Sequence, residues 1–169
     1  MPSQVEIERK YVIKMPDLAR LVTEAEYTES RIVQIYLSSE AGVTHRVRSR
    51  SFSDNVTVYT ETKKTRIDGM SAHEEEKEIS ESEFLTLSKG IKAGTRPVIK
   101  TRYTFLLGGV TFEIDVYPDW NKTAIMETEL KSREESVKMP PFIEIVREVT
   151  GDRSYSNAAM AESFPRELI

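Results

Sequence analysis

Hydrophobic and polar residues alternate along most of the chain with a period of two, which is typical of β-strands whose two faces meet different surroundings. In the first such stretch Glu6, Glu8 and Lys10 fall on one face, whereas Tyr11 and Ile13 fall on the other. The pattern predicts about eight strands, over residues 5–13, 31–38, 43–51, 55–64, 71–80, 97–107, 110–118 and 124–131.

Helical segments are expected to be few and short. Asp17 is placed to cap a short helix, and Ser80 with Glu83 forms the capping-box signature that starts a second one. Two further short helices are expected near residues 141–149 and 156–163. We therefore predict an α+β fold in which strands dominate.

Gly108-Gly109 predicts a tight two-residue turn, because glycine tolerates the positive φ that such turns require. The chain shows no internal repeat, low-complexity tract or linker-like segment. Its length is typical of one fold with its own core. We therefore expect a single domain that spans residues 1–169.

Composition narrows the possible functions. The chain contains no cysteine, which excludes disulfide scaffolds, zinc–thiolate sites and cysteine nucleophiles. Its formal net charge is −4, which argues against a general nucleic-acid binder, because binding to phosphate backbones normally requires a net basic face. No apolar run is long enough for a membrane span, and none resembles a signal peptide. We expect a cytoplasmic protein without nucleic-acid or membrane partners.

The charged face of the first strand recurs on at least five others. Acidic and basic residues occupy alternate positions in separate strands: Arg46, Arg48 and Arg50; Glu74, Glu76 and Glu78; Lys100 and Arg102; Glu113 and Asp115; Glu127 and Glu129. The positions between them are mostly apolar. Each of these strands is therefore predicted to have one ionic face and one hydrophobic face.

Two interpretations of this pattern are open. In the first, the ionic faces lie in solvent, and cross-strand pairs contribute about 0.2–1 kcal/mol each. In the second, the strands close into a barrel with the charges inside, and helices cover the apolar outer face. Burying so many charges without water or ligands would be prohibitive, so the second interpretation requires an interior that holds ions.

The residue types indicate which ions such an interior would hold. Carboxylate pairs on some strands and Arg or Lys pairs on others suit an anion that is bridged by hard cations. Oxygen ligands match Mg²⁺ or Mn²⁺, and the guanidinium fork matches phosphate oxygens. A polyphosphate with Mg²⁺ or Mn²⁺ fits this set.

The order of these residues resembles that of the CYTH domain, the family of triphosphate tunnel metalloenzymes that includes CyaB-type adenylate cyclases and thiamine triphosphatase. Glu6-Ile7-Glu8-Arg9-Lys10 is similar to the E-x-E-x-K signature of that family. The later matches come in the family's order: Arg46-x-Arg48, Lys63, Glu76-x-Glu78, Lys100-Thr101-Arg102-Tyr103, Phe112 to Val116, Glu127-x-Glu129, and Asp152 with Tyr155 and Asn157. The resemblance covers nearly the whole chain.

The resemblance implies a closed eight-stranded antiparallel β-barrel that forms a triphosphate tunnel, with a few covering helices. By position, the ligands of a first metal would be Glu6, Glu8, Glu127 and Glu129. Residues at or near a second metal would be Glu76, Glu78 and Asp115. The residues that bind the phosphates would be Lys10, Arg46, Arg48, Lys63, Lys100 and Arg102, with Arg153 at one end. The cofactor would be Mg²⁺ or Mn²⁺, with two ions per site.

Hydrolysis is the simplest chemistry for such a site, because cations and basic residues neutralise the phosphoryl oxygens while water attacks in line. Lys100 is the candidate for orienting or deprotonating that water, since neighbouring Arg102 should lower its pKa. We expect a metal-dependent hydrolase of inorganic triphosphate, acting as a monomer or homodimer. The same tunnel is compatible with hydrolysis or cyclisation of ATP, with hydrolysis of thiamine triphosphate, and with polyphosphate or nucleotide binding without turnover. A purely structural β-domain is a further alternative.

Two features depart from the family pattern. Glu74 stands where family members often carry a basic residue, and Ser154 replaces another one before Tyr155. The adjacent Lys63 and Lys64 leave open which lysine faces the tunnel; Lys63 better fits the family spacing. Arg50 and Glu74 are expected at the solvent-exposed rim.

Overall fold

The computed structural model describes residues 4–168, apart from the side chains of residues 22 and 24. Most of this range is β-structure. The strands are β1 (Gln4–Lys14), β2 (Tyr27–Leu37), β3 (Val43–Phe52), β4 (Thr57–Arg66), β5 (Ser71–Ile79), β6 (Val98–Leu107), β7 (Val110–Val116), β8 (Thr123–Glu129) and β9 (Ile145–Glu148). The helices are α1 (Leu18–Glu24), α2 (Glu81–Ser88), the 3-10 turn η1 (Arg153–Tyr155) and α3 (Asn157–Glu162).

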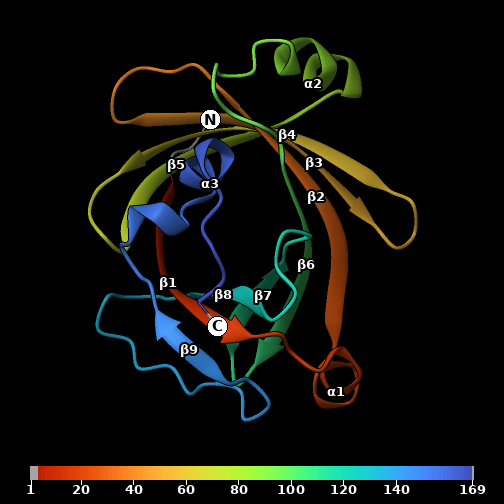
Figure 1. Cartoon of the computed structure of the whole chain (residues 1–169), viewed down its shortest axis with the longest axis vertical. Helices are drawn as coiled ribbons and strands as arrows, with labels where there is room; N and C mark the ends of the chain where they lie inside the picture. Colours follow the sequence, from red (N-terminus) through yellow and green to blue (C-terminus); the bar gives the residue numbers. More distant parts are fainter. Residues whose placement is uncertain (1–3, 169) are drawn as a thin grey trace.

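Eight of these strands close into an antiparallel barrel. Hydrogen bonds join them in the order β5-β4-β3-β2-β6-β7-β8-β1, and β1 also pairs with β5, which completes the ring seen in Figure 1. The β6–β7 hairpin turns at Gly108 and Gly109, which both have positive φ. The closed eight-stranded antiparallel barrel predicted from the sequence is confirmed.

Strand β1 is shared among three partners. It pairs along one edge with β8, while its other edge pairs first with β5 and further on with the short β9. The helix predicted over residues 141–149 is therefore wrong, because residues 145–148 hydrogen-bond as a strand to the part of β1 that β5 leaves free. This pairing between distant segments outweighs local preference.

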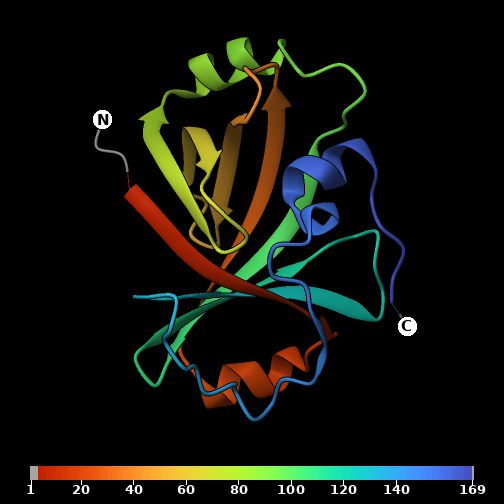
Figure 2. The same ribbon diagram turned by 90° about the vertical axis from the view of Figure 1, so that its left-hand side faces the viewer.

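Part of the outer face of the barrel is apolar and covered. Outward-facing residues of β1, β6, β7 and β8 pack with Leu21 of α1 and with Phe142 and its neighbours in the segment after β8. A smaller cluster joins Val47 and Ile79 to Phe84 of α2, whose first turn is held by the predicted capping box of Ser80. Figures 1 and 2 show α1 and α2 at opposite ends of the molecule. None of the helices within residues 4–168 is long and apolar enough to cross a membrane.

The C-terminal segment fills one end of the barrel. Helix α3, predicted near residues 156–163, places Met160 against inward-facing residues of the strands, among them Val12 and Ile125. Tyr155 of η1 is buried in the same cluster. Figure 2 shows α3 lying at the side of the strands where the C-terminus ends. The interior therefore combines an apolar end with a charged middle.

Candidate active site inside the barrel

The charged residues on alternate strand positions meet inside the barrel. Lys10 Nζ lies 3.4 Å from Glu127 Oε1 across the β1–β8 pair. Lys64 Nζ donates to Glu6 Oε2 at 2.8 Å, from β4 to β1. The residues between them pack outward into the apolar clusters, as Tyr11 does. The interpretation of the alternation that places the charges inside is therefore confirmed.

One side of the interior is basic, and we call it the basic wall. It consists of inward-facing residues of β3 and β6: Arg46, Arg48, Arg50, Lys100 and Arg102. β2 lies between these two strands and contributes mainly neutral side chains, including Gln34. The opposite side, formed by β8, β1 and β5, is acidic, and we call it the acidic wall.

Arg48 is bound by a neutral group. Its Nε and Nη2 atoms donate to the amide oxygen of Gln34, Oε1, at 2.9 and 2.6 Å. Among the described side chains, no carboxylate forms an ion pair with it. Burial lowers the pKa of Arg48 to about 9, and repulsion from Arg46 and Arg102 adds to the effect. A buried guanidinium whose charge is disfavoured in this way would be stabilised by an anion.

Arg46 carries an unused buried donor. Its Nε atom is buried and has no hydrogen-bond partner among the described residues. Burial alone would lower the pKa of Arg46, but Tyr36, Glu74 and Glu76 outweigh it and raise the pKa. Buried donors are nearly always paired in folded proteins, so this one marks a place for a ligand oxygen.

Arg102, by contrast, is held by carboxylates on both sides of its guanidinium. Its Nε and Nη2 atoms donate to Asp115 at 2.7 and 2.8 Å, and its Nη1 atom donates to Glu113 at 2.8 Å. Burial alone would raise the pKa of Asp115, but Arg102 and Lys100 hold it at about 2. Asp115 is therefore an ionised carboxylate that fixes two cations of the basic wall.

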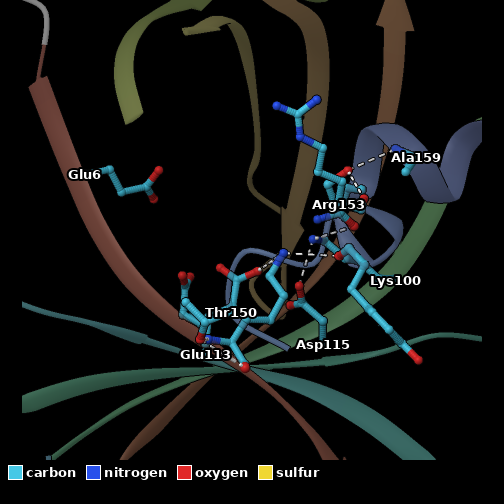
Figure 3. A network of polar contacts seen from close by, with 12 residues as sticks. Glu6, Lys100, Glu113, Asp115, Thr150, Arg153 and Ala159 are labelled. Atoms are coloured by element: carbon cyan, nitrogen blue, oxygen red, sulfur yellow. Dashed lines mark hydrogen bonds and ion pairs between the residues drawn. The ribbon is translucent and has the colours of Figure 1, made fainter. Parts of the chain in front are cut away.

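Lys100 is fully buried, and Figure 3 shows it beside Asp115. Its Nζ atom donates to Asp115 Oδ2 at 2.7 Å and lies 3.4 Å from Asn157 Oδ1. The same amide oxygen of Asn157 accepts a hydrogen bond from the Tyr117 hydroxyl at 2.7 Å. Burial lowers the pKa of Lys100 to about 7, with Arg102 and Arg48 adding to this shift and Asp115 opposing it. Lys100 can therefore exchange a proton near neutral pH.

The acidic wall crowds five carboxyl groups together: Glu6 and Glu8 of β1, Glu74 of β5, and Glu127 and Glu129 of β8. Burial raises the pKa of Glu8 well above its ordinary range, and the neighbouring Glu127 and Glu6 raise it further. Burial, followed by Glu6, raises the pKa of Glu74 to about 7. Glu8 and Glu74 therefore have too little positive charge beside them.

Two lysines supply positive charge to this wall. Lys10 reaches Glu127 and also donates to the Tyr155 carbonyl at 3.1 Å. Lys64 reaches Glu6 and lies 3.9 Å from Glu74 Oε2. Burial alone would raise the pKa of Glu6, but Lys64 outweighs it and lowers the pKa. Figure 3 shows Glu6 projecting from β1 into the interior that Lys100 and Asp115 also face.

The first predicted metal set lies together in the acidic wall. Glu8 stands opposite Glu129, and Lys10 stands opposite Glu127, so the carboxylates of β1 and β8 alternate across one strand pair. Crowded oxygen ligands that lack positive charge fit a hard cation such as Mg²⁺ or Mn²⁺. As the side chains stand, no three His, Asp or Glu side chains in the described part of the chain are gathered into a complete metal site.

The second predicted metal set is not brought together. Glu76 and Glu78 share the inward-facing register of Glu74 on β5 but are exposed. Glu76 accepts a hydrogen bond from Thr62 and raises the pKa of Arg46. Asp115 lies on β7, which does not pair with β5, and both of its oxygens are occupied by Arg102 and Lys100. Its contacts favour a role in holding those cations in place.

The prediction that Lys63 faces the phosphates is wrong. Lys63 stands opposite His45 of β3 and Glu75 of β5 on the outer face and is exposed. Lys64 faces inward and contacts Glu6. Arg153 lies in η1 and is exposed. Figure 3 shows it beside the polar cluster around Lys100.

The interior contains further residues that the sequence pattern did not assign to it. Glu74 and Arg50, expected at the solvent rim, face inward; Arg50 donates to Ser30 Oγ at 2.8 Å. Glu74 alternates with Glu76, and Arg50 alternates with Arg48, so the period of two could have placed both residues on the inner face. Gln34 and Tyr117 carry no such signal, because a neutral residue on a strand has many ordinary explanations.

Known structures share this architecture. The structure of the inorganic triphosphatase NE1496 is 30% identical, with a TM-score of 0.60, over 95% of this chain and 97% of that one. The PH1819 protein from Pyrococcus horikoshii OT3 is 23% identical over 76% of this chain and 80% of that one, with a TM-score of 0.58. A putative adenylate cyclase from Bacillus halodurans is 14% identical, with a TM-score of 0.50, over 79% and 84%. The last two show a shared fold only.

No protein-family model matches the chain, and no curated protein matches it significantly. A closed antiparallel barrel with opposed acidic and basic walls nevertheless defines its class, and the likeness to NE1496 extends over nearly the full length of both chains. The chain belongs to the CYTH family of triphosphate tunnel metalloenzymes.

Proposed function

We propose that this protein hydrolyses inorganic triphosphate to pyrophosphate and phosphate inside the barrel, with Mg²⁺ or Mn²⁺ as cofactor. The observation that carries the proposal is the charge imbalance of the two walls. On the basic wall, Arg46 Nε has no hydrogen-bond partner among the described residues, and Arg48 donates to a neutral amide. On the acidic wall, burial and neighbouring carboxyl groups raise the pKa values of Glu8 and Glu74. A polyphosphate chain with its cations supplies both missing charges. The likeness to the inorganic triphosphatase NE1496 supports the same substrate.

The residues of the basic wall bind and orient the anion. Arg46 Nε and the Arg48 guanidinium are directed to the interior, where they can donate to phosphate oxygens. Arg102 is held by Asp115 and Glu113, so its guanidinium stays in a fixed position, from which it lowers the pKa of Lys100.

The acidic wall provides the cation ligands. Glu6, Glu8, Glu127 and Glu129 would hold the cation; when bound, it supplies charge neutralisation at the phosphoryl oxygens and lowers the pKa of water. Glu74 stands next to Glu6 and adds to the negative charge of the site.

Lys100 is the proposed proton acceptor. With a pKa near 7, a fraction of this lysine is neutral at physiological pH and can take the proton of the attacking water. Asp115 and Asn157 hold its Nζ atom in place, so the lysine is oriented before the substrate arrives.

Phosphate release tests the proposal. The purified protein is incubated with tripolyphosphate, ATP or thiamine triphosphate, each with Mg²⁺, Mn²⁺ or EDTA. We expect release from tripolyphosphate with either cation, none with EDTA, and slower release from the organic substrates.

Other outcomes of this panel would contradict the proposal. Faster release from ATP or thiamine triphosphate would assign an organic substrate to the same barrel. Thermal stabilisation by tripolyphosphate without release from any substrate would indicate a binding module.

A further inference from the structure

Lys64 occupies a position among the carboxylates of the acidic wall. Its ammonium group contacts Glu6 Oε2 at 2.8 Å and Glu74 Oε2 at 3.9 Å. Glu8 also attracts it, and the lysine stays charged because these carboxylates outweigh its burial. Lys64 is therefore an internal counter-ion of the carboxylates that would hold a cation.

An ammonium group and a divalent cation cannot share the same carboxylate oxygen, because their like charges repel at contact distance. Lys64 can move away, since it is a point charge on a flexible four-carbon stem. Its side chain is about one-third exposed, so solvent reaches part of it.

A second position for the ammonium group lies on the basic side. In the β3–β4 pair, Thr62 stands opposite Arg46, and Lys64 is the next inward-facing residue along β4. Diagonal neighbours at this spacing lie within reach of long side chains. Arg46 now repels Lys64, but an anion bound at Arg46 would reverse the sign of that interaction.

We propose that Lys64 stands in for the cation when the site holds no metal, and that cation binding releases it toward the phosphate chain. The inference rests on the proposed function and describes how the binding of the cation and the binding of the anion are linked. Cation and anion are coupled through one side chain: the cation frees a phosphate ligand, and the anion draws away a competitor of the cation.

Direct Mn²⁺ binding tests this role without any turnover. Metal-free protein is titrated with MnCl₂ in the absence of phosphates, and free Mn²⁺ is followed by electron paramagnetic resonance. Lys64→Met should bind Mn²⁺ about tenfold more tightly than the wild type, because the competing charge is gone. Lys63→Met is the matched control, because this lysine lies one position along the same strand on the outer face, and its affinity should equal that of the wild type.

Lys64→Gln guards against a folding defect, because it retains a donor for Glu6 without the charge. It should also bind Mn²⁺ more tightly than the wild type, and circular dichroism checks that each variant is folded. Equal or weaker Mn²⁺ binding in both folded Lys64 variants would overturn the inference.

The failure of this inference is distinguishable from that of the proposed function. A wild-type protein that binds Mn²⁺ and releases phosphate, with Lys64 variants of unchanged Mn²⁺ affinity, removes only the role of Lys64. A wild-type protein that neither binds Mn²⁺ nor releases phosphate removes both.

Discussion

The two walls of the barrel solve the problem of buried charge in different ways. The acidic wall has lysine counter-ions, because Lys10 and Lys64 reach its carboxylates on long side chains. The basic wall is divided: Arg102 is neutralised by Asp115, whereas Arg48 donates to the neutral amide of Gln34.

This difference separates charges that are neutralised within the folded chain from charges that a bound ligand would neutralise. A bidentate Arg102–Asp115 pair is complete without any other molecule. Arg48 and the crowded Glu8 are not, because burial works against both of their charges. Four sets of variants test this contrast, with effects that are expected to decrease from the first set to the last.

Neutralising the acidic wall should have the largest effect. The double change Glu6→Gln and Glu8→Gln removes two proposed cation ligands and should lower kcat for triphosphate by about a thousandfold, since charge neutralisation by the cation contributes several kcal/mol. Far-UV circular dichroism should show an intact barrel. Glu75→Gln, on the exposed face of the same sheet, is the control and should keep its activity. Retained turnover in the double variant would remove these residues from the cation site.

Removing the proposed proton acceptor comes next. Lys100→Met should lower kcat by about a hundredfold. In the wild type, kcat should rise as pH increases through about 7, because the neutral amine is the active form; this rise should be missing in the variant. Lys92→Met, at an exposed ion pair with Glu162, is the control. An unchanged pH profile in Lys100→Met would assign the proton transfer to another group.

The contrast within the basic wall is tested by two matched changes. Arg102→Met leaves Asp115 buried without its main partner and should lower the free energy of unfolding by about 3–5 kcal/mol. Arg48→Met removes an uncompensated charge but leaves Gln34 Oε1 without its donor, so it should change that free energy by no more than about 1 kcal/mol.

Arg48→Met should instead raise KM for triphosphate about tenfold or more, because a charge-assisted contact with phosphate is lost. Urea unfolding without ligand and steady-state kinetics measure the two quantities. Equal destabilisation by Arg48→Met and Arg102→Met would show that the wall is not divided.

The smallest effect concerns the carboxyl group of Glu74. Its pKa is raised in the folded protein to about 7, so it costs stability above that pH, and the cost disappears as pH falls from about 7 toward its ordinary pKa near 4.5. In EDTA, Glu74→Gln should be more stable than the wild type by about 1 kcal/mol at pH 8, and the difference should close near pH 4.5. Thermal unfolding at several pH values measures it. A constant difference across this range would mean that Glu74 does not titrate there.

Much of the barrel could be predicted from alternation alone. The period of two separates Tyr11 from Lys10 and assigns each strand an inner and an outer face, and closing the ring brings those inner faces together. The turn at Gly108 was also predictable, because glycine readily adopts the positive φ found there.

The strand at residues 145–148 was not predicted, because it depends on pairing between segments that are far apart in the sequence. Residues 145–148 become a strand only because β1 offers them a free edge, which no local pattern reveals. Lys63 and Lys64 differ in face by one position, and family spacing selected the wrong one. Val58 shares its parity with Lys64 and Tyr59 shares its parity with Lys63, so the apolar residues of β4 do not select between the two lysines.

The site was predicted in its composition and only partly in its contacts. The arginines and the first carboxylate set were assigned by their order along the chain, and the structure brings them to one interior. Both oxygens of Asp115 accept hydrogen bonds, and Asn157 contacts Lys100. These contacts join side chains from strands and a helix that are far apart in the sequence. Such contacts are fixed by packing, which a single sequence does not display.

The arrangement of β1 also bears on how the chain folds. Lys10 N donates to Thr150 Oγ1, a hydrogen bond between residues that are 140 positions apart. Closing so long a loop costs chain entropy before any contact repays it, so ring closure is expected to be the slow, late event of folding. Until residues 123–148 have left the ribosome, β1 has neither β8 nor β9 to pair with, and it must wait beside an incomplete sheet.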